Sequence, residues 1–465
     1  MGDLHVHHGT RRATRRLSEI AEGTPFAGKL ERAMFRDLYA QWMYRWETRL
    51  TMRDENRVVR PLEWGFEWLT PFLEQAGIAE RVERLAATGQ DGGERAMVEI
   101  NQAILADSDR FFGYDTPTDF RLEERYPQLF PTNVRPETLK RDAELEQRAR
   151  EGKLQRTQFL RFTSPERTPY AENDLVNARW YPADPAKQAG KPKQAMVVMP
   201  QWNADAFSHN VLCALFNRFG ISALRLSKPY HDIRRPSELE RSDYAVSANI
   251  GRTLSATRQA VVDVRCCVDW LESQGYEQFG VLGTSLGSCY GFLASAHDKR
   301  LRVNAFNHAS AAVGDVVWAG QSTRHIRAGL EEAGLTQERV RALWAGVSPM
   351  HYYKKFAQHS LLNASQQAQE RADFAKKVLL IYSQYDLTFP LEYSLKVVQS
   401  FHEHGIEFER RVLPCGHYTT GETPFQYIDG WYLGSFVYRA FRDLAREKPN
   451  PDVEVAQPVG ELVSR

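Results

Sequence analysis

Short hydrophobic runs alternate with amphipathic segments from about residue 160 onward. The runs consist largely of Val, Leu, Ile and Phe, which is typical of strands buried on both faces of a mainly parallel sheet. The segments between them repeat hydrophobic residues at helical spacing. This alternation predicts an open α/β sheet with helices on both sides. The expected strands are residues 175–181, 195–200, 222–227, 279–283, 303–306, 378–382 and 408–413.

The helical parts of this region are of two kinds. Between strands, the segment 207–219 should place Val211 and its other hydrophobic residues on one face and end at Gly220. Residues 311–375 contain no convincing strand, whereas Trp318 and Trp344 belong to a helical hydrophobic pattern. We therefore expect residues 311–375 to form an inserted helical lid.

The N-terminal third is helical in pattern and rich in aromatic residues. Phe35, Leu38, Trp42 and Trp46 fall on one helical stripe. Large hydrophobic side chains mostly lie inside proteins, so we expect this stripe to pack into a core. A cap over an apolar substrate site and a patch at a membrane surface remain alternatives.

The expected organisation has three parts. Residues 1–155 form an N-terminal helical extension or cap, residues 156–447 form the α/β domain with its lid at about 311–375, and residues 448–465 form a loose tail. The extension starts with a basic arm that contains Arg11, Arg12, Arg15 and Arg16.

Composition excludes several classes of partner. The 465 residues include 60 Lys and Arg and 59 Asp and Glu, so the net charge of +1 gives no argument for nucleic-acid binding. No hydrophobic run is long enough to span a bilayer, and the N-terminus lacks the apolar core of a signal peptide. Five cysteines without a Cys-x-x-Cys pair predict reduced thiols and no structural zinc site. We expect a cytoplasmic protein without a metal or another cofactor, whose only membrane contact would be peripheral.

The stretch Gly283-Thr-Ser-Leu-Gly287 lies between a predicted strand and a predicted helix. A tight turn at this place strains the backbone of the middle residue and projects its side chain above the sheet. Ser285 is therefore a candidate nucleophile, although it could also be an ordinary first residue of a helix. The amide that follows it, from Leu286, would lie at a helix N-terminus and could bind an oxyanion.

A serine nucleophile needs a base, and the base needs an orienting acid. Asp386 follows the strand 378–382, and His417 follows the strand 408–413. Both lie just beyond the carboxyl ends of strands, where open α/β sheets bind their ligands. Singly, Asp386 could be a helix cap and His417 a loop histidine. Together with Ser285, the chain order Ser, Asp, His predicts a catalytic triad.

On these motifs, residues 175–440 resemble an α/β-hydrolase. The matching stretches are Gly283-Thr-Ser-Leu-Gly287, Tyr385-Asp-Leu-Thr-Phe-Pro390 and Cys415-Gly-His417. The resemblance implies Ser285 as nucleophile, His417 as base and Asp386 as orienting acid. A second similarity, to the abhydrolase-domain-containing protein 18 group, is carried by Pro229-Tyr-His-Asp-Ile-Arg-Arg-Pro236.

The chain departs from the usual hydrolase pattern after the strand 195–200. Such hydrolases carry His-Gly there, where one amide completes the oxyanion hole, and this chain has Met199-Pro-Gln-Trp-Asn-Ala204. We expect the second oxyanion donor to be the amide of Trp202, with Gln201 and Asn203 as rivals.

Three other side chains near the same sheet edge could bind substrate. His308 follows the strand 303–306 and could contact substrate, but a packed, hydrogen-bonded histidine is the simpler interpretation. Arg234 and Arg235 could bind an acidic substrate group, but a solvated loop or a salt bridge to the acidic segment 232–243 is an equally good interpretation.

Taken together, the sequence predicts a serine hydrolase whose substrate is a small-molecule carboxylic ester that is apolar or medium-sized. An acyltransferase or a serine peptidase would use the same triad, and a non-catalytic binding protein would leave it idle. Dehalogenation is disfavoured because Ser285, and not an aspartate, stands at the turn.

Overall fold

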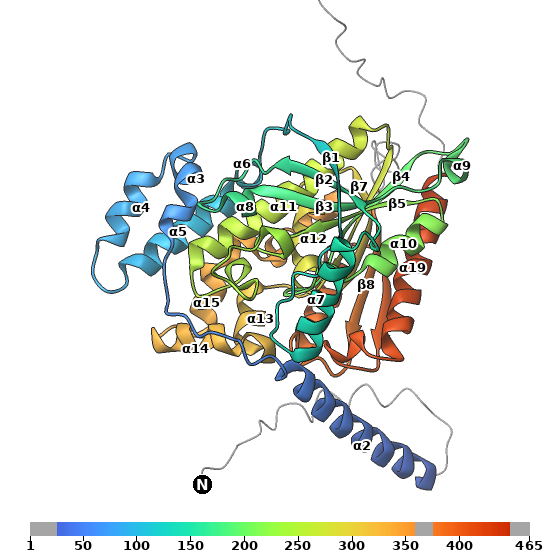
Figure 1. Cartoon of the computed structure of the whole chain (residues 1–465). Coiled ribbons are helices and arrows are strands. Elements are labelled where there is room, and N and C mark those ends of the chain that lie inside the picture. The colour runs from blue at the N-terminus through green and yellow to red at the C-terminus, as the bar shows by residue number, and fades with distance from the viewer. Residues whose placement is uncertain (1–25, 359–374, 447–465) are drawn as a thin grey trace, which may run out of the picture.

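One nine-stranded sheet organises the chain (Figure 1). The computed structural model describes residues 26–358 and 375–446. The strand order is β1-β2-β3-β5-β4-β6-β7-β8-β9. Every pair from β5 to β9 is parallel, and β1, β2 and β3 form an antiparallel extension beside β5. The expectation of a mainly parallel sheet is confirmed. The strands are β1 (Arg121–Arg125), β2 (Thr157–Thr163), β3 (Leu175–Tyr181), β4 (Gln194–Met199), β5 (Ser222–Ser227), β6 (Gln278–Thr284), β7 (Leu301–Asn307), β8 (Lys377–Ser383) and β9 (Glu409–Leu413).

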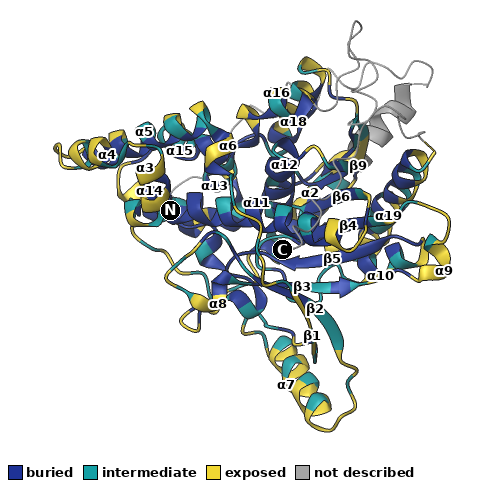
Figure 2. Ribbon diagram, turned by 90° about the horizontal axis from the view of Figure 1, so that it is seen from above, coloured by how far each residue is buried: buried dark blue, intermediate teal, exposed yellow. Residues whose placement is uncertain are grey.

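Helices cover both faces of this sheet, as Figures 1 and 2 show. Helices α4 and α7 carry many exposed residues, whereas α11 and α12 are almost entirely buried (Figure 2). The α-helices of the described residues are α2 (Phe26–Thr51), α3 (Thr70–Gln75), α4 (Ala79–Ala86), α5 (Gly92–Ala106), α6 (Ser108–Phe111), α7 (Pro136–Arg150), α8 (Ala171–Asp174), α9 (Pro185–Gln188), α10 (Asn210–Arg218), α11 (Ile250–Ser273), α12 (Leu286–Ala296), α13 (Val313–Ala319), α14 (Arg324–Glu332), α15 (Gln337–Leu343), α16 (Tyr353–Gln358), α18 (Leu391–Glu403) and α19 (Phe425–Leu444).

The continuous hydrophobic runs reflect burial on both faces. In β4, Val197 and Met199 pack into the core with α11 and α12, while Met196 and Val198 pack into a second core with α10 and α19. All four side chains are fully buried. Because neighbouring residues of a strand point to opposite faces, a strand covered on both sides needs a hydrophobic residue at every position.

All seven predicted strands are present, with bounds that differ by two residues or fewer. The two remaining strands, β1 and β2, were not predicted. β1 lies inside the N-terminal third, where the pattern predicted only helices, so that prediction is wrong at residues 121–125. β1 pairs with β2 and thereby joins the main sheet.

The hydrophobic stripe on α2 does not pack as expected. Leu38 and Trp42 are 57% and 51% exposed, so the core interpretation is wrong for these two residues. Trp46 is partly buried and contacts Phe425 with ring centroids 6.2 Å apart. The buried face of α2 is instead formed by Met43 and Glu47, one helical turn apart.

Other expectations concern α10, the insertion and the termini. Val211 is 85% exposed on α10, so its assignment to a buried face is wrong. Between β7 and β8 the described residues form only helices, α13 to α16 with short 3-10 turns, and the rest of the expected lid, residues 359–374, lies outside the described part. The basic arm and the C-terminal tail also lie outside it.

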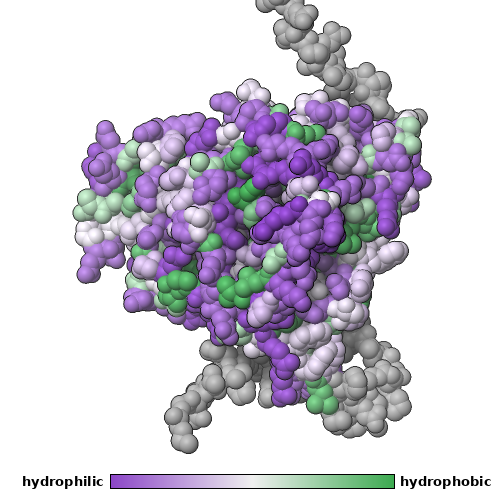
Figure 3. Space-filling view, viewed as in Figure 1, coloured by the Kyte–Doolittle hydropathy of each residue, from purple (hydrophilic) through white to green (hydrophobic). Residues whose placement is uncertain are grey.

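The helices of the described residues can be compared with the length and hydropathy that a membrane span needs. None of their helices is both long enough and apolar enough to cross a bilayer. The face seen in Figure 3 is mainly hydrophilic, with several separate hydrophobic patches.

Candidate active site

Ser285 occupies the turn between β6 and α12 with φ 57° and ψ −120°. A positive φ is costly for a residue with a side chain, and such strain is concentrated at functional sites. The flanking glycines make the turn sterically feasible. A Cβ atom on Gly283 would lie 2.1 Å from the carbonyl oxygen of Gly287, and one on Gly287 would lie 2.3 Å from that of Met199. The turn therefore requires glycine at both positions.

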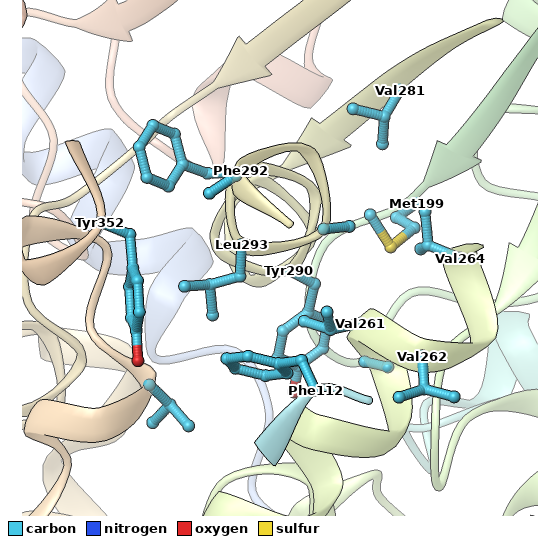
Figure 4. Packing of buried hydrophobic residues seen from close by; sticks show 14 of the residues in the cluster. Phe112, Met199, Val261, Val262, Val264, Val281, Tyr290, Phe292, Leu293 and Tyr352 are labelled. Atoms are coloured by element: carbon cyan, nitrogen blue, oxygen red, sulfur yellow. The ribbon is translucent and has the colours of Figure 1, made fainter. Parts of the chain in front are cut away.

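Helix α12 is anchored by its own core residues (Figure 4). Tyr290 and Leu293 are fully buried and lie in the same cluster as Val261 of α11 and Met199 of β4. Close packing of this kind resists small displacements. The position of Ser285 at the start of α12 is therefore fixed by the packing of the central sheet.

The structure brings Ser285, His417 and Asp386 together in one chain of hydrogen bonds. His417 Nε2 lies 2.9 Å from Ser285 Oγ, and His417 Nδ1 lies 2.9 Å from Asp386 Oδ2. Each residue follows the carboxyl end of a different strand: β6, β8 and β9. In this arrangement Ser285 can pass its proton to Nε2 while Asp386 holds the opposite side of the ring.

An oxyanion hole needs main-chain N–H donors near Ser285, and these can come from the start of α12 and from the loop after β4. Leu286 is the first residue of α12, and the first N–H groups of a helix have no acceptor within it. The loop after β4 lies against this helix start, as the approach of Met199 and Pro200 to Gly287 shows. In that loop the N–H of Asn203 donates to His231 Nε2 at 3.3 Å, which removes Asn203 from the candidates.

The amides of Trp202 and Gln201 keep their place as candidates for the second oxyanion donor. Neither N–H has a hydrogen-bond acceptor among the residues that the structure describes. Both belong to the loop beside the helix start, so a choice between them needs a bound oxyanion or a mutational test.

A serine at a strained strand-to-helix turn of a mainly parallel sheet, followed along the chain by its acid and then its histidine, is the arrangement of one fold family. The chain has the α/β-hydrolase fold.

Comparisons with solved structures return enzymes at low similarity, among them an esterase, a hydrolase and a peptidase. Acetyl xylan esterase from Paenibacillus sp. R4 is 12% identical with a TM-score of 0.44, and the match covers 73% of this chain and 92% of the esterase. The 2,6-dihydroxy-pseudo-oxynicotine hydrolase is 12% identical with a TM-score of 0.44, covering 84% and 93%. Pyrococcus horikoshii acylaminoacyl peptidase is 12% identical with a TM-score of 0.43, covering 62% of this chain and 46% of the peptidase.

Sequence comparisons add no relative. No family model and no curated protein matches this chain. The similarity to the abhydrolase-domain-containing protein 18 group is therefore not supported. The activity of this hydrolase fold has to be judged from its own residues.

Asp386 is held by more partners than His417 alone. Its Oδ2 also lies 3.2 Å from Nδ1 of His308, and its Oδ1 accepts hydrogen bonds from the main chain at Thr388 and Phe389, at 2.7 and 2.6 Å. Burial alone would raise the pKa of Asp386, but the two histidines lower it well below its usual range. The carboxylate therefore stays charged.

His308 is a packed histidine, as the simpler interpretation expected. It is 1% exposed, and its Nε2 lies 3.3 Å from Thr420 Oγ1. Burial lowers its pKa, and so does the charge of His417. A neutral His308 can donate from Nδ1 to Asp386 without competing for the proton that His417 receives.

The charge environment of His417 favours its protonated form. Burial by itself would lower the pKa of the imidazole, but the charge and hydrogen bond of Asp386, followed by the charge of Glu47, raise it above its ordinary value of 6.5. A base with a raised pKa accepts the proton of Ser285 more readily.

Glu47 is a site residue that sequence reasoning missed. Its carboxylate is fully buried and reaches from α2 to the loop that carries His417. Oε1 accepts the N–H of Tyr418 at 2.8 Å, and Oε2 accepts the N–H and the hydroxyl of Thr419 at 2.9 and 3.0 Å. A Cβ on Gly416 would lie 2.4 Å from Oε2, which explains the glycine of Cys-Gly-His. No local motif marks a glutamate whose partners lie 371 and 372 residues further along the chain.

His308, Asp386 and His417 also form the only group of three potential metal-binding side chains within the described ranges, with ligand atoms within 4.8 Å of one another. Hydrogen bonds account for this cluster, because both Nδ1 atoms lie at hydrogen-bond distance from the same carboxylate oxygen.

Arg234 and Arg235 do not point to substrate. Arg234 is completely buried and pairs with Asp263 of α11 at 2.8 Å, so its predicted partners in the segment 232–243 were wrong. Arg235 donates to the carbonyl of Pro131 at 2.9 Å. Both residues hold the loop after β5 in place.

Proposed function

We propose that this chain is a serine hydrolase that cleaves carboxylic esters through an acyl-enzyme on Ser285. The observation that carries the proposal is the unbroken hydrogen-bond chain from Ser285 through His417 to Asp386 at the strained turn. A structural serine would not require a positive φ or a buried histidine partner that is itself hydrogen-bonded to a carboxylate.

The reaction begins when Ser285 Oγ attacks the ester carbonyl carbon and its proton moves to His417 Nε2. Asp386 keeps the tautomer that donates from Nδ1 and stabilises the imidazolium. The amide of Leu286, together with that of Trp202 or Gln201, holds the oxyanion. His417 then returns the proton to the leaving alcohol, and water repeats the sequence to release the acid.

The surroundings suggest how substrate is enclosed. Ser285 is only 6% exposed, and the helical segment after β7 contacts the loop of Asp386, where the N–H of Gln321 donates to the carbonyl of Leu387 at 2.7 Å. We propose that this segment acts as the lid. Such an enclosed site would suit an ester that is apolar or medium-sized.

The test is a hydrolysis screen over p-nitrophenyl esters of increasing acyl-chain length, together with labelling by a fluorophosphonate probe. The wild type should label and hydrolyse at least one ester. Ser285→Ala should lose labelling and at least about 10³-fold in kcat/KM. Ser435→Ala, on α19 and outside the site, serves as the control. Labelling of wild type and Ser285→Ala to the same extent would refute the assignment.

Two alternatives use the same atoms. An acyltransferase or peptidase would need the triad and would be recognised when an added alcohol or amine diverts the acyl group from water, or when amide substrates are cleaved faster than esters. A non-catalytic binding protein would fail to label although it is folded.

A further inference from the structure

A second group of polar side chains lies beside the proposed reaction centre, outside the triad. It surrounds Trp202, which follows β4 in the candidate oxyanion loop, and Tyr418, which follows His417. Its members come from three segments that are far apart in the sequence: Arg57 and Arg60 after α2, Arg241 from the loop before α11, and His325 from α14.

His325 is the most unusual member. It is 8% exposed, and neither ring nitrogen has a hydrogen-bond partner among the described residues. Its ring is stacked on Trp202, with centroids 5.9 Å apart and 5° between the planes. Burial lowers its pKa to about 3, and the charges of Arg241, Arg57 and Arg60 contribute. A neutral imidazole with two unused nitrogens next to cations calls for an explanation, because buried polar groups are normally satisfied.

Arg57 and Arg60 have spare donors. The Nε atoms of both are buried and have no partner, and neither guanidinium has a carboxylate within ion-pair distance in the described part of the chain. One Arg57 nitrogen donates to the carbonyl of Thr51, and the Arg60 guanidinium lies over the ring of Tyr244, 5.6 Å from its centroid. An arginine offers five N–H donors in a planar fork, so much of this capacity is unused.

Arg241, unlike Arg57 and Arg60, forms ion pairs with nearby carboxylates of the described residues. It is 3% exposed on its side chain, pairs with Asp54 at 3.3 Å and Asp243 at 3.2 Å, and lies over Trp202 at 5.6 Å. These two carboxylates already have this arginine as their partner. Three arginines (Arg57, Arg60 and Arg241) thus face two carboxylates, which leaves one positive charge in excess over these acids.

The segment that carries Arg57 and Arg60 is packed against a helix. It runs past α14 between α2 and α3 in Figure 1. Gly329 of α14 allows the closest approach, because a Cβ at that position would lie 1.9 Å from the carbonyl oxygen of Arg60. Arg57 and Arg60 are thus part of a packed region and not of a loose surface arm.

We propose that Arg57, Arg60 and His325 form a subsite for an anionic oxygen group of the substrate, a carboxylate or a phosphate. This inference rests on the proposed function and narrows it to esters that carry a negative charge away from the scissile bond. The guanidinium groups bind the anion through charge-assisted hydrogen bonds. Trp202, whose ring contacts both His325 and Arg241, connects this subsite to the oxyanion loop.

The test compares two esters that share the leaving group and the acyl-chain length. Mono-p-nitrophenyl glutarate carries a terminal carboxylate, and p-nitrophenyl valerate is neutral. The wild type should favour the glutarate by at least about ten-fold in kcat/KM. Arg57→Met and Arg60→Met should each move this ratio toward one, and the ratio corrects for any loss of folded enzyme.

Arg53→Met provides the matched control, because Arg53 lies in the same segment, is half exposed and pairs with Glu137 at 3.5 Å. Its ratio should equal that of the wild type. Competition against valerate separates the two sources of the anion: glutarate as the stronger inhibitor indicates a carboxylate, and inorganic phosphate as the stronger inhibitor indicates a phosphate. Equal rates on both esters, without inhibition by either anion, would overturn the subsite while leaving the hydrolase intact.

If no ester is hydrolysed, the subsite is judged by binding alone. Glutarate or phosphate should raise the melting temperature of the Ser285→Ala protein and should not raise that of Ser285→Ala combined with Arg60→Met. An equal or absent shift in both would overturn the inference.

Discussion

Replacing Glu47 by Gln tests how a distant helix tunes the proposed base. The change keeps the size of the side chain and removes one negative charge that faces His417. It also replaces one acceptor by an NH₂ group next to the main-chain donors of Tyr418 and Thr419. Burial raises the pKa of Glu47, which hydrogen bonds from Tyr418 and Thr419 only partly oppose. The charged form is therefore less favourable in the fold than in water, so the neutral amide should be tolerated.

The size of the electrostatic effect follows from the geometry. The carboxylate binds the N–H groups of the two residues after His417, and two residues of extended chain span about 7 Å, which we take as the scale of the charge separation. Two unit charges at this separation interact by about 1–2 kcal/mol for effective dielectric constants of about 20–40. Since about 1.4 kcal/mol corresponds to one pKa unit, Glu47→Gln should lower the pKa of His417 by about one unit.

The direction of the pKa change of His417 can be measured from the pH profile of ester hydrolysis. A base acts in its neutral form, and the pKa of the proposed base His417 is raised above 6.5, so the acid limb of kcat/KM of the wild type should lie above that pH. In Glu47→Gln the limb should move to lower pH. The assay is ester hydrolysis from about pH 5 to 9. Glu55→Gln removes an exposed carboxylate just after α2 and should leave the limb in place.

A second variant separates the effect of the Glu47 charge on His417 from the hydrogen bonds by which Glu47 holds the histidine loop. Glu47→Ala leaves the N–H groups of Tyr418 and Thr419 without their acceptor, at a cost of about 1–3 kcal/mol for each buried donor, and should lower the melting temperature. An acid limb that stays at the wild-type pH in a folded Glu47→Gln protein would refute the electrostatic role of Glu47.

Two further predictions concern the turn and the surface of α2. Gly287→Ala should lower the melting temperature and activity together, because its Cβ would meet the main chain of Met199, whereas Gly430→Ala on α19, where a Cβ meets nothing within 4 Å, should not lower the melting temperature. If α2 contacts membranes through its exposed ring, Trp42→Ser should sediment less with anionic vesicles than the wild type; equal sedimentation would dismiss that contact.

The sequence allowed the central sheet to be predicted because its strands are covered on both faces. A strand such as β4 then needs hydrophobic residues at every position, and this leaves a continuous run that is hard to miss. The candidate triad was accessible for a related reason. Ser285 and Asp386 each follow such a run, His417 follows the mostly exposed edge strand β9, and the sheet brings the ends of these parallel strands to one edge.

The features that were missed leave no such trace. β1, with the sequence Arg-Leu-Glu-Glu-Arg, is a partly exposed edge strand without a hydrophobic face, so only its pairing with β2 defines it. On α2 the aromatic stripe was the more visible pattern, yet the face that packs inward contains Met43 and a glutamate. A buried carboxylate can be recognised only when its donors are known, and those of Glu47 come from the other end of the chain.

The reach of Glu47 has a consequence for how this protein could be divided. A polypeptide that began at residue 156 would keep Ser285, Asp386 and His417, but it would uncover the hydrogen-bonding edge of β2 and deprive the histidine loop of its buried anchor. The first third and the hydrolase core therefore share one folding unit. Gene fusions, proteolytic trimming and domain exchange that separate them should yield a protein with the right reactive groups and no stable means of holding them.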